Sequence, residues 1–321
     1  MATFLEGLNS STNATWENYI EQKDNVPEVP FNYQYISNTA NVPVAYKTCE
    51  GFSLEQINWR KLSYSALSPS HIGAAIENRK NPENEYDQFV FRDLKRGAKT
   101  GNLLHYIFEN IDFANEKNWN KLVENAIKRT GYNNSTWTND KLIALLRNAL
   151  QSEIRTPNDI FSMSQVSTEQ RLNELEFDFP LRPFHTNQLK SLAEEISQWD
   201  VKDLEQLEGI MNGKIDLFFE KNGKYYVLDW KSNYLGDATE DYEQEKLALA
   251  MAENNYNLQY HIYTVAVNKY LKTRLPNFNY ERDFGGVIYL FLRGLRTGSN
   301  NGVFFHKPDW SNIEKLESVW N

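Results

Sequence analysis

MNGKIDLFFEKNGKYYVLDWKS, residues 211–232, is the stretch that decides the fold of this chain. Two runs of alternating apolar and aromatic residues flank the dipeptide Asn222-Gly223. Asn-Gly between two such runs is the strongest short-range signal for a β-hairpin with a two-residue turn. The sequence therefore predicts two antiparallel strands joined at this dipeptide.

Counting back equally from the turn places Lys221 opposite Lys224 and Asp216 opposite Asp229. Directly opposed side chains in an antiparallel pair have Cβ atoms about 4.5–5.5 Å apart, and like charges at that distance destabilise the pair. A bound divalent cation is the simplest group that would offset the repulsion. The hairpin therefore predicts a metal site.

Side chains alternate along a strand, so Lys231 points to the same face as Asp229, two residues earlier. Trp230 points to the opposite face, together with the other apolar residues of the hairpin, which are Leu228, Ile215, Leu217 and Phe219. One face of the hairpin is thus predicted to pack against the core. The other is predicted to carry an Asp, Asp, Lys site.

The composition is that of a globular protein. The chain has 321 residues, of which 40% are hydrophobic and 14% aromatic, enough for one large or two ordinary domains. No apolar run approaches the ~20 residues that cross a bilayer, and the N-terminus lacks the basic-then-apolar order of a signal peptide. We expect a cytoplasmic protein that does not contact membranes.

Cysteine and charge exclude several classes of site. The single cysteine, Cys49, rules out an intramolecular disulfide and a four-cysteine zinc or iron–sulfur site within this chain. The net charge of −9 argues against a general nucleic-acid coat protein. Short basic clusters at residues 92–99 and at Arg293 with Arg296 could still neutralise a few phosphates, although ordinary solvated charge is an equally open interpretation.

The chain divides by composition into two parts. Residues 1–57 are rich in Asn, Thr and Pro and are predicted to be a tether or an irregular segment, and residues 58–321 are predicted to form the main domain. Periodicity within that domain predicts helices at 101–113, 119–129, 139–153, 240–253 and 258–271, and strands at 175–179, in the hairpin and at 285–292. This order predicts an α/β fold, a three-layer α/β/α sandwich around a mixed β-sheet with helical additions.

Further candidates lie on the predicted helices. Gln259 and Tyr263 are four residues apart and share a face that can reach the carboxylates, although Tyr263 in the core with Gln259 at the surface is the alternative. His105, beside an apolar stripe, is a weak signal alone. The segment at residues 97–101, GAKTG, lacks the spacing and preceding strand of a phosphate-binding P-loop, so no ATPase site is predicted.

Four motifs in order carry a family resemblance: Gly101-x-x-x-His105, Gly213-x-x-Asp216, Asp229-Trp230-Lys231 and Gln259-x-x-x-Tyr263. Together they resemble the nuclease signature of the RecB branch of the PD-(D/E)XK superfamily. The stretches GNLLHYIFENIDF, YYVLDWKSNYLG, YNLQYHIYT and FGGVIYLFLRGL resemble the C-terminal nuclease domain of that branch, and the resemblance covers about residues 59–308. Trp230 stands where a tyrosine is common, but its position faces away from the site.

The resemblance implies a metal-dependent DNA nuclease, mainly for single strands, that uses Mg²⁺ or Mn²⁺. It implies an exodeoxyribonuclease V type of activity within a RecBCD-type helicase–nuclease in double-strand break repair, with RecC-like and RecD-like partners. No helicase motif is found in the sequence, so the chain looks like the C-terminal portion of a longer protein.

Roles follow for the individual residues. Asp216 and Asp229 are the expected principal metal ligands, because hard oxygen ligands suit these cations. The resemblance adds His105 as a further ligand, and the backbone carbonyl of Trp230 is another candidate. Lys231 would orient the attacking water or stabilise charge on phosphorus. Gln259 and Tyr263 would position the strand or the nucleophile. Glu176 is a candidate outer-shell carboxylate, with Glu174 and Asp178 as competitors.

Two other functions remain open. A catalytically idle nuclease fold that serves as a docking module would bind helicase subunits tightly but not Mg²⁺ or Mn²⁺. A free-standing phage-type exonuclease would assemble into a ring. The intact Asp, Asp, Lys set argues against the docking module.

Overall fold

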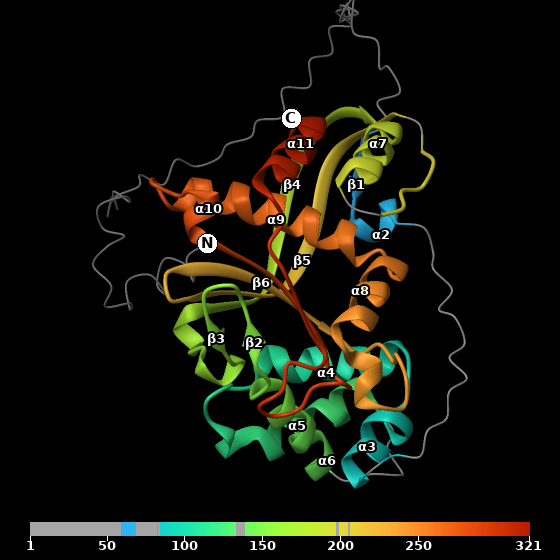
Figure 1. Cartoon of the computed structure of the whole chain (residues 1–321), viewed down its shortest axis with the longest axis vertical. Coiled ribbons are helices and arrows are strands. Elements are labelled where there is room, and N and C mark those ends of the chain that lie inside the picture. The colour runs from blue at the N-terminus through green and yellow to red at the C-terminus, as the bar shows by residue number, and fades with distance from the viewer. Residues whose placement is uncertain (1–58, 69–81, 83, 133–138, 197–198, 205) are drawn as a thin grey trace, which may run out of the picture. The chain divides into compact units, whose positions relative to one another are not determined.

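The computed structural model describes residues 59–68, 82, 84–132, 139–196, 199–204 and 206–321. The predicted tether at residues 1–57, which includes Cys49, lies outside this part of the chain and stays a prediction. The described residues form a six-stranded sheet, a small two-stranded sheet and surrounding helices (Figure 1). The large sheet contains β1 (Trp59–Leu62), β4 (Arg171–His185), β5 (Gln206–Lys221), β6 (Lys224–Lys231), β7 (Phe284–Phe291) and β8 (Val303–His306). The small sheet pairs β2 (Ile154–Arg155) with β3 (Ile160–Phe161).

The predicted hairpin is confirmed as β5 and β6. Its ladder runs from the pair Lys221 and Lys224 next to the turn to the pair Leu217 and Leu228, in the expected register. Asn222 and Gly223 have φ angles of 52° and 75°. A two-residue turn with both central residues at positive φ is type I′, which matches the twist of the flanking strands.

The sheet is mixed, as predicted. Its strands follow the order β1-β5-β6-β7-β8, with β4 on the other edge of β5, and β6 pairs with β7 in parallel. The edge of β5 that faces β1 and β6 is shared between them: β1 pairs with residues 208–211 and β6 with residues 217–221. Residues 212–216 of that edge have no ladder partner among the described strands. The sheet is therefore split at the position of Asp216.

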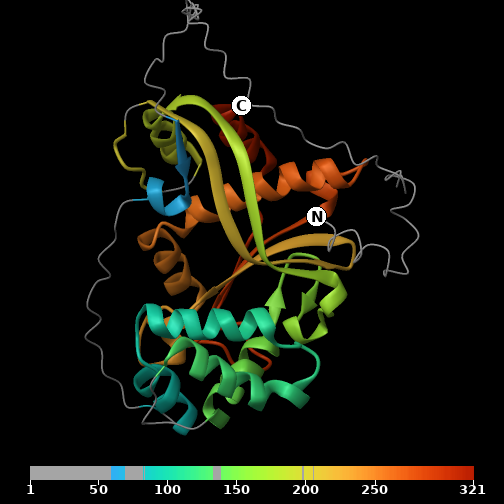
Figure 2. The ribbon, with the colours of Figure 1, turned by 180° about the vertical axis from the view of Figure 1, so that it is seen from behind.

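Helices cover both faces of the sheet. Phe108 of α4 (Ala98–Asn110) stacks on Trp230 with ring centroids 4.0 Å apart, whereas Gln259 of α9 (Tyr256–Arg274) accepts a hydrogen bond from Lys231. Adjacent strand residues point to opposite faces, so α4 and α9 lie on opposite sides of β6. Figures 1 and 2 show the hairpin between these two helices. The three-layer α/β/α arrangement is thus confirmed.

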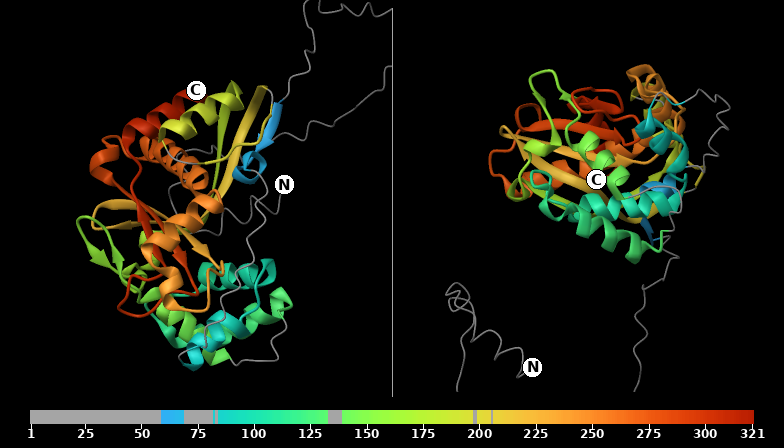
Figure 3. Two further views of the ribbon diagram at one scale, coloured as in Figure 1. Left: turned by 45° about the vertical axis from the view of Figure 1, so that its right-hand side comes forward. Right: turned by 90° about the horizontal axis from the view of Figure 1, so that it is seen from below.

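The remaining helices extend the two layers. On the α4 side, α5 (Trp119–Thr130) packs on α4 and α6 (Asn139–Leu150) on α5, while α7 (Thr186–Ile196) and α11 (Trp310–Trp320) pack beside β4 (Figure 3). The others are α2 (Tyr64–Leu67), α3 (Glu85–Gln88), α8 (Gln244–Glu253) and α10 (Tyr280–Asp283). The five predicted helices are present as α4, α5, α6, α8 and α9, whereas α7, α11 and the short helices α2, α3 and α10 were not predicted.

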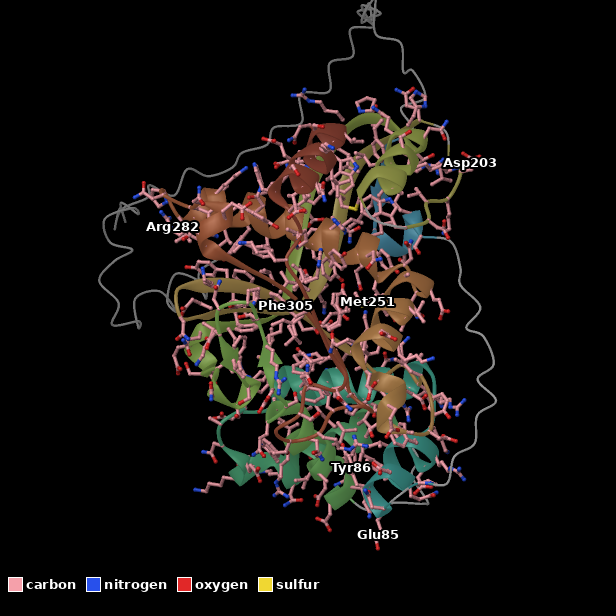
Figure 4. The ribbon with its side chains drawn as sticks, in the orientation of Figure 1. Glu85, Tyr86, Asp203, Met251, Arg282 and Phe305 are labelled. Atoms are coloured by element: carbon pink, nitrogen blue, oxygen red, sulfur yellow. The ribbon has the colours of Figure 1, made fainter. Side chains whose placement is uncertain are left out.

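Side chains fill the space between these layers (Figure 4). Met251 of α8 is buried, whereas Glu85 and Asp203 project from the periphery. The middle of α9 is buried all round, as expected for a helix enclosed between a sheet and other helices. No helix within the described ranges combines the length and apolarity needed to cross a membrane.

Candidate active site

Asp216 lies where the sheet splits. Its Oδ2 atom accepts a hydrogen bond from the backbone N–H of Trp230 at 2.8 Å. The hairpin ladder ends at the pair Leu217 and Leu228, one residue before the expected pair of Asp216 and Asp229. Beyond it, the backbone N–H of Trp230 donates to the Asp216 side chain and not to a backbone carbonyl of β5. A residue in a strand directs its N–H and C=O to the same edge. The carbonyl of Trp230 is therefore directed toward the Asp216 side, and the next carbonyl, of Lys231, accepts from Leu292 of the neighbouring strand segment at 2.9 Å.

Asp229 and Lys231 form a buried ion pair. Lys231 Nζ lies 2.5 Å from Asp229 Oδ1. Apart from this ammonium, Asp229 Oδ1 has no hydrogen-bond partner within the described structure. Burial, together with the charge of Asp216, raises the pKa of Asp229 to about 6, although Lys231 opposes the shift. Burial alone would lower the pKa of Lys231, but the surrounding carboxylates, chiefly Asp229, outweigh it and raise that pKa. Lys231 is therefore a fixed cation at neutral pH.

A network of polar groups holds the Lys231 ammonium. Gln259 Oε1 accepts hydrogen bonds from Lys231 Nζ at 3.1 Å and from the Tyr289 hydroxyl at 3.0 Å. Gln259 Nε2 donates to Tyr263, whose hydroxyl donates to the carbonyl of Lys214. The ammonium also lies 3.9 Å from the ring centroid of Tyr256, close enough for a cation–π contact. Gln259 and Tyr263 are both buried, so the alternative of a surface Gln259 is wrong.

His105 reaches the carboxylates from α4. Its Nδ1 atom lies 3.3 Å from Asp216 Oδ2, and its side chain is about one-third exposed at 36%. Burial would lower the pKa of His105, but the hydrogen bond and charge of Asp216 outweigh it, so the pKa is raised above its ordinary value. His105, Asp216 and Glu174 offer ligand atoms within 4.8 Å of one another. Asp229 stands outside this group and remains on Lys231.

Glu174 is the carboxylate of β4 that joins the site. Glu174, Glu176 and Asp178 share one face of the strand, so alternation alone could not choose between them. The β4–β5 register decides, because Asn173 pairs with Leu217 and Leu175 with Ile215, which puts Glu174 opposite Asp216. Glu174 has a left-handed φ of 54° and an ion pair with Lys214 at 2.5 Å, whereas Glu176 and Asp178 are exposed.

These residues fit a divalent cation. Carboxylate oxygens and one imidazole are suitable ligands for such an ion. Asp229 Oδ1 is a buried oxygen that contacts the Lys231 ammonium and accepts no other hydrogen bond among the described residues, so it keeps lone pairs for an ion. Burial and the charge of Asp216 raise the pKa of Asp229, and a divalent cation between the two carboxylates would oppose that shift.

Sequence patterns missed two tyrosines of the site. Tyr256 lies at the start of α9 against Lys231, and Tyr289 is fully buried in β7. Tyr289 had a usable signal, because a hydroxyl in a strand that is apolar on both faces needs a buried partner. Tyr256 had no such signal, since aromatic residues are common at the start of a helix and do not by themselves indicate a site.

Arg293 fits neither of its two open interpretations, a phosphate contact or an ordinary solvated charge. Arg293 is wholly buried, and its guanidinium donates to the backbone carbonyls of Ser232, Val90, Leu94 and Lys95. Arg296 is mostly buried and pairs with Asp87. Both side chains are occupied in holding the protein together, which the local sequence does not reveal.

Comparison with known proteins agrees with this geometry. Residues 79–315 match the model of the PD-(D/E)XK nuclease superfamily. The chain is 32% identical over 307 residues to the RecBCD enzyme subunit RecB of Haemophilus influenzae, covering 88% of this chain and 24% of that protein. For the same subunit the identity is 32% over 282 residues in Escherichia coli (82% and 23%) and 30% over 318 residues in Buchnera aphidicola from Acyrthosiphon pisum (94% and 26%). The chain thus spans about a quarter of the length of these relatives. It belongs to the PD-(D/E)XK nuclease superfamily and is similar to RecB subunits in that region.

Proposed function

We propose that this chain is a metal-dependent DNA nuclease that hydrolyses phosphodiester bonds, with Mg²⁺ as its ion and Mn²⁺ as a substitute. One observation carries the proposal: Asp229 lies buried beside a second carboxylate, Asp216, and its Oδ1 atom lies against a fixed lysine cation. Two adjacent carboxylates suit a divalent cation, and the lysine beside them suits phosphate chemistry.

The proposed ligands are Asp216, Asp229, His105 and the backbone carbonyl of Trp230. Glu174 is a further carboxylate within reach of His105 and Asp216. A divalent ion held there would lower the pKa of a bound water and stabilise negative charge on the phosphate. His105 must be neutral to ligate, and its neighbour Asp216 fixes the orientation of the ring.

Lys231 supplies a positive charge beside the phosphate. Because the pKa of Lys231 is raised, its role is that of a cation that stabilises charge or orients the water, and not that of a base. Gln259 keeps the ammonium in place through its hydrogen bond, and Tyr263 and Tyr289 each fix one end of the Gln259 amide. Gln259 and Tyr263 are thus proposed to position the catalytic lysine.

The substrate and assembly are proposed from the relatives. Those relatives are RecB subunits of the RecBCD enzyme. We propose by analogy that this chain acts mainly on single-stranded DNA, as an exodeoxyribonuclease V type activity in double-strand break repair and recombination, with RecC-like and RecD-like subunits. A cytoplasmic location is part of the same proposal.

The test is degradation of end-labelled linear single-stranded DNA in Mg²⁺. The wild-type chain should degrade it, Asp229→Ala should not, and EDTA should stop the reaction. Asp203→Ala is the matched control, because Asp203 has an exposed carboxylate at the periphery (Figure 4). Equal degradation by wild type and Asp229→Ala would place the reaction elsewhere. Circular single-stranded DNA in a parallel reaction shows whether the isolated chain needs a DNA end for cleavage.

A docking module without catalysis is distinguished by calorimetry. It predicts no heat of Mg²⁺ or Mn²⁺ binding and no degradation by the wild type. A ring-forming exonuclease is distinguished by light scattering after size-exclusion chromatography, where a monomer would exclude it.

A further inference from the structure

A basic segment lies next to the end of β6. Residues 92–99 connect the π-helical turn Phe89–Asp93 to α4, and they expose the side chains of Arg92, Lys95, Arg96 and Lys99. We call this segment the basic turn. It concentrates positive charge in a protein whose net charge is −9. Such a local patch attracts anions that the rest of the surface repels.

Arg293 fixes the basic turn to the active-site strand. Its guanidinium donates to the carbonyl of Ser232, which directly follows Lys231, and to the carbonyls of Leu94 and Lys95 inside the basic turn, at 2.9–3.0 Å. Arg293 has no exposed surface. A planar fork of donors that bridges two backbone segments restricts their relative movement. The basic turn and the end of β6 therefore form one rigid unit.

Arg96 is held in a defined position. Its guanidinium carbon lies 3.3 Å from the ring centroid of Tyr234, in the loop that follows β6. The Tyr234 hydroxyl donates to Asp237 at 2.5 Å, and Arg92 pairs with the same carboxylate at 3.6 Å. A guanidinium stacked on an aromatic ring keeps its N–H edge available for other partners. Little side-chain freedom remains to be lost when Arg96 binds an anion.

The basic turn is close to the proposed reaction centre. Tyr234 is three residues beyond Lys231, so the two Cα atoms are at most about 11 Å apart. On α4, a Cβ at Gly101 would lie 3.6 Å from Ser232 Oγ, and His105 one turn later reaches Asp216. Lys99 lies in the first turn of the same helix and His105 in the second, about 120° apart around the helix axis.

We propose that the basic turn, with Arg96 and Lys99 as its principal residues, binds the backbone phosphates of single-stranded nucleic acid next to the bond that is cut. The proposal rests on the proposed nuclease function and names the part of the site that holds the strand. The carboxylates Asp216, Asp229 and Glu174 repel a polyanion, so a strand that crosses them needs cationic contacts on its neighbouring phosphates. Arg293 is a positioning residue for these contacts.

The test is equilibrium binding of a fluorescein-labelled 20-nucleotide single strand in EDTA, where no cleavage occurs, at several salt concentrations. Each phosphate contact contributes about 0.7 to the slope of log K against log salt for single strands. The double variant Arg96→Ala with Lys99→Ala should reduce the slope by about 1.4 and weaken binding about tenfold near 0.1 M salt. Lys272→Ala with Arg274→Ala is the matched control, because it removes the same charge from the far end of α9 and should change neither quantity.

Cleavage gives the second readout. In Mg²⁺ the KM of the double variant for the 20-mer should rise about tenfold, and the loss should shrink as the substrate is shortened to a dinucleotide. An unchanged salt slope and unchanged KM in the double variant, or an equal loss in the control, would overturn the basic turn as a strand-binding element. A double variant that loses the predicted salt slope, in a protein whose wild-type chain never cuts the strand, would rule out the nuclease function and leave the binding assignment standing.

Discussion

The two faces of the β5–β6 hairpin are built from alternate residues of the same strands and are opposite in character. On one face Trp230 stacks on Phe108 and meets Phe113 edge-on, in a dry aromatic layer. On the other, Asp229 and Lys231 bury opposite charges beside Asp216. The side chains of the first face are stabilised by packing alone. The second places two carboxylates side by side, which raises the pKa of Asp229. This difference separates the residues that stabilise the fold from those proposed to react.

The largest effect is expected on the charged face. Lys231→Ala should lower kcat by about a thousandfold, since removing a group that stabilises transition-state charge typically costs 10²–10³ or more. It should leave Mn²⁺ binding intact, because Lys231 is not a ligand. Calorimetry and single-turnover cleavage on the same preparation measure both. Loss of Mn²⁺ binding together with cleavage would mean that Lys231 supports the ligands and has no separate role.

A substitution on the aromatic face should lower the free energy of unfolding and leave kcat nearly unchanged. Trp230→Ala should reduce the free energy of unfolding by about 3–5 kcal/mol, because it removes a large buried ring from a close-packed layer. Trp230→Tyr is the control and should cost much less. Urea unfolding gives the stability, and kcat of the folded fraction should stay within a few-fold of wild type. A large fall in kcat with unchanged stability would show that the two faces are not separate.

The pH dependence of metal binding should come from the charged face. Asp229 has a pKa raised to about 6 and His105 a pKa raised above its ordinary value, so both bind protons that an ion must displace as the pH falls. The Mn²⁺ affinity should therefore fall at least about tenfold per pH unit below pH 6 and level off once both groups are deprotonated. The stabilisation by Mn²⁺ relative to EDTA, measured by thermal unfolding from pH 5 to 8, should follow the same curve. Trp230→Tyr should leave the curve in place, and a flat profile would exclude these two groups as ligands.

The smallest effect on kcat is expected from Tyr289, whose hydroxyl is linked to Lys231 through Gln259. Tyr289→Phe removes one hydrogen bond to Gln259, worth about 0.5–1.5 kcal/mol. Without it the Gln259 amide holds Lys231 less firmly, so kcat should fall about threefold to tenfold while KM and Mn²⁺ affinity stay the same. Tyr270→Phe, on the outer part of α9, is the matched hydroxyl deletion. Equal kcat in both variants would assign Tyr289 to packing alone.

Local patterns predicted the hairpin and its two faces, because the turn dipeptide and the alternation are properties of adjacent residues. The split in the sheet was not predictable in this way. It depends on β1 pairing with β5 at residues 208–211, far away in sequence. The choice of Glu174 over Glu176 depends on the β4–β5 register in the same manner. Arg293 looked like a surface charge because the carbonyls that bind it come from residues 90–95 and 232.

The sequence motifs predicted part of the site. Gln259, Tyr263 and Lys231 lie in one network, and His105 lies against Asp216, as their motifs led us to expect. The expectation that Asp216 and Asp229 share one ion stays a prediction. The close group of potential ligand atoms is His105, Glu174 and Asp216, while Asp229 is paired with Lys231.

A crystal of the protein soaked with Mn²⁺ and measured for anomalous scattering tests most directly whether Asp216 and Asp229 bind one ion. We predict a peak within about 2.0–2.4 Å of oxygens of both Asp216 and Asp229, with His105 as a ligand and Lys231 moved off Asp229. A peak held by His105, Glu174 and Asp216 with Asp229 still paired to Lys231 would contradict it, as would no peak at this hairpin.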